Sequence, residues 1–135
     1  MSMMAKHPEN FVVVGENIHT TRIVLREGKK HRVLKDGIEV VTYTDASGEL
    51  ATMRVPHWIK ETQPYEQGQV KHFMIAVRGG IGEDELAQAE GRAYVQAEAL
   101  RQIKAGASYL DLNVDEVSYK LDVQTDCMRW LVEAV

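Results

Sequence analysis

The sequence predicts an α/β fold in which an antiparallel β insert interrupts a parallel core. Three observations support this class: an apolar run at residues 11–15 that ends in glycine, a helix followed by a short apolar strand at residues 108–113, and several short β-rich runs between them. A buried parallel strand has a nearly continuous run of apolar residues, which the first and second observations fit. The β-rich runs, over residues 18–82, are typical of an antiparallel meander.

Turn dipeptides divide the insert into strands. Asp36-Gly37 and Ser47-Gly48 each separate two β-branched runs, and this pattern is a strong hairpin signal. The glycines after Arg78 are predicted to form a turn, because the acids at residues 83–85 would repel an anion from a phosphate-binding loop. A loop is expected over residues 56–65. The predicted strands are residues 22–26, 31–34, 38–44, 49–55 and 71–77.

Two helices are predicted around the second apolar strand. The first begins at the acidic residues 83–85 and ends at Gly106, as helix-dipole and capping preferences favour. The second covers residues 122–135 and has no glycine cap, so we expect the sequence to be the front part of a longer protein. The spacing of apolar residues predicts the buried face of the first helix, made of Leu86, Ala89, Ala93, Ala97, Leu100 and Ile103.

Composition narrows the functional class. The net charge of −4 argues against nucleic acid as a partner. Cys127 is the only cysteine, which fits a reducing cytosol, and we expect it to be a small core residue. No apolar run approaches the roughly 20 residues of a membrane span, and the first ten residues do not resemble a signal peptide. We therefore expect a cytoplasmic protein with no membrane or nucleic-acid partner.

The histidines and tryptophans are weak candidates for chemistry. We expect no metal site, because the histidines lack metal-ligand spacing. His19 follows the first strand and could reach a pocket, but solvent exposure or loop packing is the favoured interpretation. Trp58 and Trp130 are expected to anchor the core or the insert. The five histidines are His7, His19, His31, His57 and His72.

The strongest candidate site lies where the two parallel strands end. Asp111 and Asn113 are two residues apart in a strand, so they point to the same side. Glu16 and Asn17 follow the first strand, and the carboxyl ends of parallel strands are where α/β folds bind ligands. The alternative is that Asn17 and Asp111 satisfy loop backbone, as Asn and Asp commonly do.

The chemistry of these side chains suits a pterin. Asp111 offers a carboxylate acceptor, while the amides of Asn17 and Asn113 both donate and accept hydrogen bonds. The 2-amino-4-oxo-pyrimidine edge of a pterin presents an amine and a ring N–H beside acceptors. This mixture of donors and acceptors complements it.

Four ordered motifs resemble the start of a known family, the pterin-binding methyltransferases. These comprise the methyltetrahydrofolate:corrinoid methyltransferases and the folate domain of cobalamin-dependent methionine synthase, which are relatives of dihydropteroate synthase. The resemblance covers residues 11–20 and 84–135. The chain departs from the family by its insert, and by Asp115-Glu116 where the family usually continues with Gly. The motifs are Val14-Gly-Glu-Asn-Ile18, Ala105-Gly-Ala107, Leu110-Asp-Leu-Asn-Val114 and Met128-Arg-Trp-Leu-Val-Glu133.

The resemblance implies both a fold and an activity. Residues 1–135 would be the start of a TIM-type (β/α)8 barrel, namely its first two βα units, with the insert at 18–82. The parent protein would transfer the N5 methyl group of methyltetrahydrofolate to a corrinoid, or cobalamin, on a partner protein or domain. We expect this chain alone to be inactive, because the family's main pterin-binding residues lie on later strands. Open sheet edges would also favour a homo-oligomer. Residues implied to contact the pterin are Glu16, Asn17, Asp111 and Asn113.

Two alternatives remain open at this point. A dihydropteroate synthase-like enzyme would use the same pocket, and a non-catalytic binding module would rely on the insert. The insert carries 10 Lys/Arg and 7 Asp/Glu, a net +3, against 6 and 13, a net −7, elsewhere. Its basic residues could attract the folate glutamate tail or an acidic corrinoid protein, or could form a solvated hairpin without a partner. These residues are Arg22, Arg26, Lys29, Lys30 and Arg32.

Overall fold

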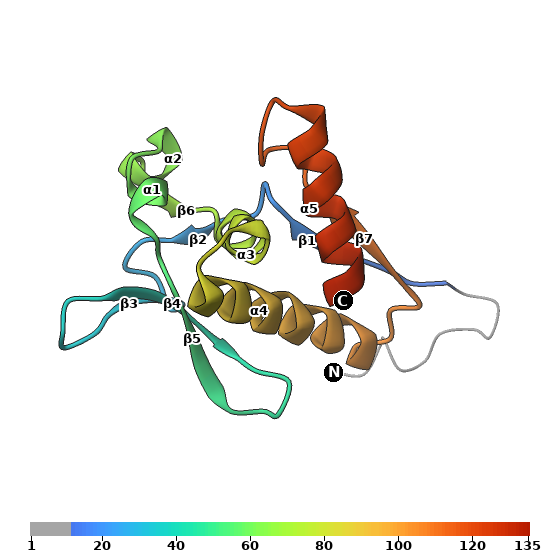
Figure 1. The fold of residues 1–135 in the computed structure, drawn as a ribbon. Helices are drawn as coiled ribbons and strands as arrows, with labels where there is room; N and C mark the ends of the chain where they lie inside the picture. Colours follow the sequence, from blue (N-terminus) through green and yellow to red (C-terminus); the bar gives the residue numbers. More distant parts are fainter. Residues whose placement is uncertain (1–11) are drawn as a thin grey trace.

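The strands form three small sheets, and three longer helices pack beside them (Figure 1). The computed structural model describes residues 12–135. This arrangement is a mixed α/β fold, as predicted, and the described residues form no closed barrel. The elements are β1 (Val14–His19), β2 (Val24–Leu25), β3 (His31–Val33), β4 (Glu39–Thr44), β5 (Leu50–Arg54), α1 (His57–Lys60), α2 (Gln63–Glu66), β6 (Gln69–Val70), α3 (His72–Ile81), α4 (Glu85–Lys104), β7 (Tyr109–Asn113) and α5 (Leu121–Ala134).

The insert contains the predicted antiparallel meander. Strands β3, β4 and β5 pair in sequence order, and β2 pairs separately with β6. Both predicted hairpin turns are confirmed, with Gly37 and Gly48 at φ angles of 84° and 86°. Glycine adopts this left-handed region at little cost, which is why each dipeptide turns the chain where it does. The predicted loop over residues 56–65 instead contains the two short helices α1 and α2.

Strands β1 and β7 form the predicted parallel pair. β1 begins at Val14, later than the predicted 11–15 strand, and continues through His19. Phe11 lies outside the described residues. α4 contacts β1 and α5 contacts β7, so the helices cover one face of this pair. Figure 1 shows α5 running beside β7, with α4 crossing below.

The predicted strand at residues 71–77 is wrong, because these residues begin helix α3. A short apolar run fits a buried helix as well as a strand, and here Phe73, Ala76 and Val77 are all buried. The predicted turn after Arg78 is wrong for the same reason, since it forms the last turns of α3. Gly80 serves close packing, because a Cβ atom there would lie 2.1 Å from the Trp130 ring.

Helix α4 has the predicted ends but a different buried face. Asp84 caps its start by accepting hydrogen bonds from the amides of residues 86 and 87. Gly106, at φ 107°, closes its end, with the Gly106 and Ala107 amides bonded to the carbonyls of residues 103 and 102. Leu86 and Ile103 are 54% and 53% exposed, contrary to the prediction. Of the predicted positions Ala97 is buried, and the helix also buries Gly91, Tyr94, Val95, Ala99 and Gln102.

A polar cluster holds the insert together. The amide of Glu27 donates to Nδ1 of His31, so the proton of this imidazole is on Nε2 and is donated to Glu39 at 2.5 Å. The hydroxyl of Tyr65 also donates to Glu39, at 2.7 Å, and Nζ of Lys60 lies 3.4 Å away. Burial opposes the charge of Glu39, but these hydrogen bonds outweigh it and hold its pKa below the usual value. The cluster thereby joins β3 and β4 to α1 and α2.

The backbones of helices α3 and α4 approach each other closely at Gly91. A Cβ atom added to Gly91 would lie 2.3 Å from the carbonyl oxygen of Ala76. Because that oxygen belongs to the backbone of a buried helix, it cannot move aside without shifting α3.

None of the helices in the described part of the chain is both long and apolar enough to cross a membrane.

We predict that Gly91→Ala destabilises the protein by about 1–3 kcal/mol, as overpacking of a core usually does. Helix propensity alone would favour alanine by about 1 kcal/mol, so the sign of the effect separates the two causes. Urea denaturation followed by circular dichroism measures it. Arg92→Ala, at the next and exposed position of α4, is the matched control and should change the free energy of unfolding by less than about 0.5 kcal/mol. A stabilising Gly91→Ala would contradict the proposed close contact.

Candidate functional site

A β-bulge shapes the predicted site. Gly15 pairs with Leu110 and Ile18 pairs with Leu112, so Glu16 and Asn17 together lie opposite the single residue Asp111. The extra residue re-aims the side chains of the bulged strand, which is a common device next to ligand sites. Glu16 and Asn17 are both exposed and lie within β1, although the sequence placed them after the first strand.

Asp111 lies on the uncovered face of the parallel pair, where it pairs with His19. Leu110 and Leu112 pack against the core, while Tyr109 and Asp111 are exposed on the other side, as the alternation of strand side chains predicts. Nε2 of His19 lies 3.2 Å from Oδ2 of Asp111, with side-chain exposures of 20% and 53%.

The sequence reasoning missed the pairing of His19, which it assigned to solvent or loop packing. The register of β1 against β7 places His19 opposite Asn113 and therefore beside Asp111. No local pattern carries this information, since the two paired residues are 92 positions apart.

Asn113 is committed to a local turn. Its Nδ2 donates to Asp115 at 3.1 Å, and its Oδ1 accepts from the amide of Asp115 at 3.0 Å. The alternative interpretation gave such a loop-capping role to Asn17 and Asp111, whereas the structure shows it at Asn113. Asp115 thus takes one Nδ2 hydrogen and one Oδ1 lone pair of Asn113, which is half of the hydrogen-bonding capacity of the amide.

Asn17 and Glu16 line a different hollow from the one predicted. With Gly15 and Gln102 they surround about 180 Å³ between β1 and the end of α4. Gln102 is buried, its Nε2 donates to Glu98, and its Oε1 has no hydrogen-bond partner in residues 12–135. A Cβ atom at residue 15 would lie 1.9 Å from that oxygen, which explains the glycine. Asp111 is not among the residues that line this hollow, although it lies opposite Glu16 and Asn17 in the strand pair.

The largest of the described clefts, about 650 Å³, lies at the carboxyl end of β7. Its volume is within the roughly 300–1,000 Å³ typical of small-molecule sites, and its position matches the usual ligand edge of parallel sheets. The insert and the loop after β7 form its walls. The lining residues are Ile59, Thr62, Pro64, Lys71, Met74, Arg78, Asp115, Glu116, Val117, Ser118 and Tyr119.

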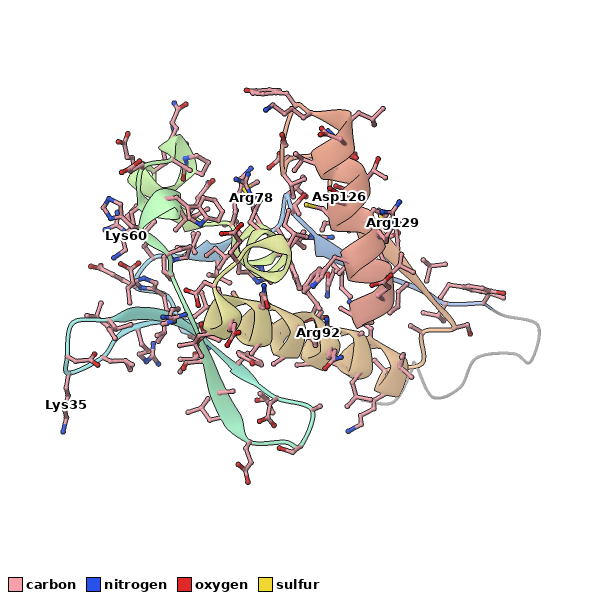
Figure 2. The ribbon with its side chains drawn as sticks, viewed as in Figure 1. Lys35, Lys60, Arg78, Arg92, Asp126 and Arg129 are labelled. Atoms are coloured by element: carbon pink, nitrogen blue, oxygen red, sulfur yellow. The ribbon has the colours of Figure 1, made fainter. Side chains whose placement is uncertain are left out.

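Lys71, which immediately precedes α3, and Arg78, within α3, both contact the loop after β7. Lys71 forms an ion pair with Glu116. Arg78 donates to the carbonyl of Val117 at 2.7 Å, and its guanidinium lies 5.2 Å from the centre of the Trp58 ring. Figure 2 shows Arg78 extending from α3 into the space between the insert helices and α5. The cleft therefore has a fixed, mixed-charge wall.

The remaining candidate residues from the sequence lie in the core or at the surface of the protein. Cys127 is fully buried, as expected, and burial raises the pKa of its thiol. Trp130 packs against the core, whereas Trp58 is partly exposed beside Arg78. His57 forms an exposed pair with Glu61, and His7 lies outside the described residues. Within residues 12–135 no group of three or more His, Cys, Asp or Glu side chains could hold a metal ion.

Comparisons with models of protein families, with curated proteins and with solved structures give no match to this chain. Inferences about function therefore depend on its own residues and geometry.

His72 is the most strongly perturbed titratable group near Asn17. Its burial, together with the charges of Lys30 and Arg22, lowers its pKa to about 3. The unfolded chain protonates this imidazole near pH 6.5, whereas the folded protein does so only near pH 3. Between these values the unfolded state binds more protons, so the free energy of unfolding falls as the pH falls.

We predict that His72 contributes a slope of about 1.4 kcal/mol per pH unit to the free energy of unfolding below pH 6. His72→Gln should remove that contribution, and His57→Gln should not, because His57 is exposed. Urea denaturation of the three proteins at pH 7, 6 and 5 measures the slopes. Equal slopes in His72→Gln and the unsubstituted protein would show that His72 is not buried in its neutral form.

Proposed function

We propose that residues 1–135 form the first two βα units of a pterin-binding (β/α)8 barrel of the cytoplasm. In this proposal the barrel holds methyltetrahydrofolate for methyl transfer to a corrinoid, or cobalamin, on a partner protein or domain. The observation that carries the proposal is the His19–Asp111 pair on the uncovered face of a parallel strand pair, close to its carboxyl end.

The uncovered face supports the barrel. Parallel sheets are normally covered on both faces, but here Val14, Tyr109 and Asp111 are exposed opposite the helices. Each strand of the pair also has one edge without a partner among the described residues. Further strand–helix units would pair with these edges, and the exposed face would then become the inside of a barrel.

The side chains on this face suit the pterin ring. With Nε2 of His19 protonated, the imidazole donates to Oδ2 of Asp111 and fixes the carboxylate, which leaves Oδ1 as an acceptor. A carboxylate acceptor complements the amine and ring N–H of the pterin edge. Because Asn113 is bonded to Asp115, Asp111 is the principal pterin contact in this proposal.

The barrel would act by positioning and by assisting proton transfer. A methyl group leaves N5 more readily when that nitrogen is protonated, since the departing amine is then neutral. Holding the pterin ring in a fixed orientation lowers the entropic part of the barrier. The corrinoid, when bound to its partner, supplies the methyl-accepting cobalt.

We predict that Asp111→Ala weakens methyltetrahydrofolate binding by about 1–3 kcal/mol, the usual cost of removing a hydrogen-bonding partner of this kind. The measurement is isothermal titration calorimetry on the complete gene product that contains residues 1–135. Asp126→Ala is the matched control, because Asp126 is an exposed acid on α5, 3.8 Å from Arg129, and is not one of the residues placed at the proposed site (Figure 2).

Three results together would support the pterin site. The unsubstituted protein binds methyltetrahydrofolate, Asp111→Ala weakens this binding, and Asp126→Ala leaves it unchanged. Equal affinity in all three proteins, with unchanged circular dichroism, would reduce Asp111 to a structural partner of His19. Absence of pterin binding by the unsubstituted protein would favour the binding-module alternative.

A further inference from the structure

A cavity of about 170 Å³ opens between the start of the insert and helices α3 and α4. It is smaller than the roughly 300–1,000 Å³ pockets that enclose whole drug-sized ligands, so it suits a single chemical group. Three of its lining residues are Arg or Lys. The lining residues are Asn17, Arg22, Ile23, Val24, Lys30, His72, Phe73, Glu98 and Arg101.

Arg22 and Lys30 reach this cavity from two separate segments whose backbones are fixed. The amide of Arg22 donates to the carbonyl of His19 at 3.0 Å, immediately after β1. The carbonyl of Lys30 accepts from the amide of Thr42 at 2.7 Å, at the start of the meander. Within residues 12–135 neither side chain forms an ion pair with an acid.

The other basic residues of the insert are used differently. Arg26 stacks on the Tyr65 ring, 4.2 Å from its centre, and Arg32 donates to two backbone carbonyls of its own turn. Lys29 is exposed and does not line the cavity. Of the five basic residues singled out in the sequence, only Arg22 and Lys30 line the cavity.

One acid also lines the cavity, and its charge is already balanced. Glu98 accepts from Arg101 at 2.5 Å and from Nε2 of Gln102 at 3.0 Å. Arg22, Lys30 and Arg101 carry three positive charges against the one negative charge of Glu98, a net of +2. Such an excess in a partly enclosed space attracts an anion.

A buried imidazole adds a directed hydrogen-bond donor. His72 is 8% exposed, and its Nδ1 is bonded to the hydroxyl of Tyr94. Burial raises the pKa of Tyr94, so its hydroxyl stays protonated and can donate to Nδ1. The proton of the neutral imidazole is then on Nε2, which has no hydrogen-bond partner among the described residues although His72 lines the cavity.

We propose that this cavity binds a small oxyanion, the phosphate or carboxylate group of a ligand, through Arg22, Lys30 and Nε2 of His72. Guanidinium and ammonium groups form the strongest hydrogen bonds to such oxygens, and the imidazole N–H supplies a fixed direction. Asp111 does not line this cavity, so the anion site is separate from the proposed pterin contact. Arg101 also lines the adjoining hollows of about 180 and 280 Å³, along which the rest of a ligand can extend.

Titration of the complete gene product that contains residues 1–135 with inorganic phosphate tests this site, and glutarate serves as the carboxylate probe. Ionic strength is held constant with chloride, and binding is followed by calorimetry and by the ¹⁵N resonance of His72 Nε2. We expect saturable binding that shifts this resonance. Arg22→Gln and Lys30→Gln should each weaken binding about tenfold, the usual effect of losing one charged hydrogen bond. Lys29→Gln, at the neighbouring position that does not line the cavity, should change affinity less than twofold.

Each outcome decides the proposal. Tighter binding of phosphate than of glutarate assigns a phosphate-bearing ligand, and the reverse assigns a carboxylate-bearing one. Absence of saturable binding of both probes overturns the site, as does an unshifted Nε2 resonance. Equal losses in Lys29→Gln and Lys30→Gln would show only general charge attraction, which also overturns it. Because no pterin is used, failure here is distinguishable from failure of the proposed pterin site.

Discussion

The close contact of α3 with α4 is the constraint on which the rest of the structure depends. Because residue 91 is glycine, the backbone of α4 approaches the Ala76 carbonyl, and the first two turns of α3 are largely buried. From this position α3 also contacts β1 and α5, so it links the parallel pair to both of the longer helices. The same contact brings His72 against Tyr94, with ring centres 5.6 Å apart. The packing of α3 against α4 therefore shapes both the core and the proposed oxyanion cavity.

The two proposed sites lie on different sides of β1. The bulge at Glu16 and Asn17 places Asn17 at the cavities beside α4, while His19 pairs with Asp111 on the uncovered face. Without the bulge, the side chains of β1 would alternate strictly between the two faces of the parallel pair. One inserted residue moves every side chain that follows it to the other face. The bulge therefore lets one short strand contribute to both sites. An extended ligand that reached both would have to pass over the end of the parallel pair.

His31 and His72 show how one residue type takes opposite roles in this fold. Both are buried, but His31 uses both ring nitrogens, one toward the Glu27 amide and one toward Glu39. All its hydrogen-bonding capacity serves the insert, as is usual for buried polar groups. His72 uses only Nδ1, and the positive charges of Lys30 and Arg22 act on its ring. Nε2 of His72 thus keeps a hydrogen-bond donor for the proposed anion.

The sequence by itself determined the local features. The turns at Gly37 and Gly48, the Asp84 cap and the Gly106 closure each depend on a few neighbouring residues, and the parallel strands follow from apolar runs. It also located Asp111 as a polar residue at a strand end, but not its partner. Only the tertiary structure decided that residues 72–81 form a helix, because a short apolar run fits either element until its neighbours are known. Likewise, the pairing of His19 with Asp111 and the convergence of Arg22, Lys30 and His72 depend on strand register and helix packing, which join residues far apart in the chain.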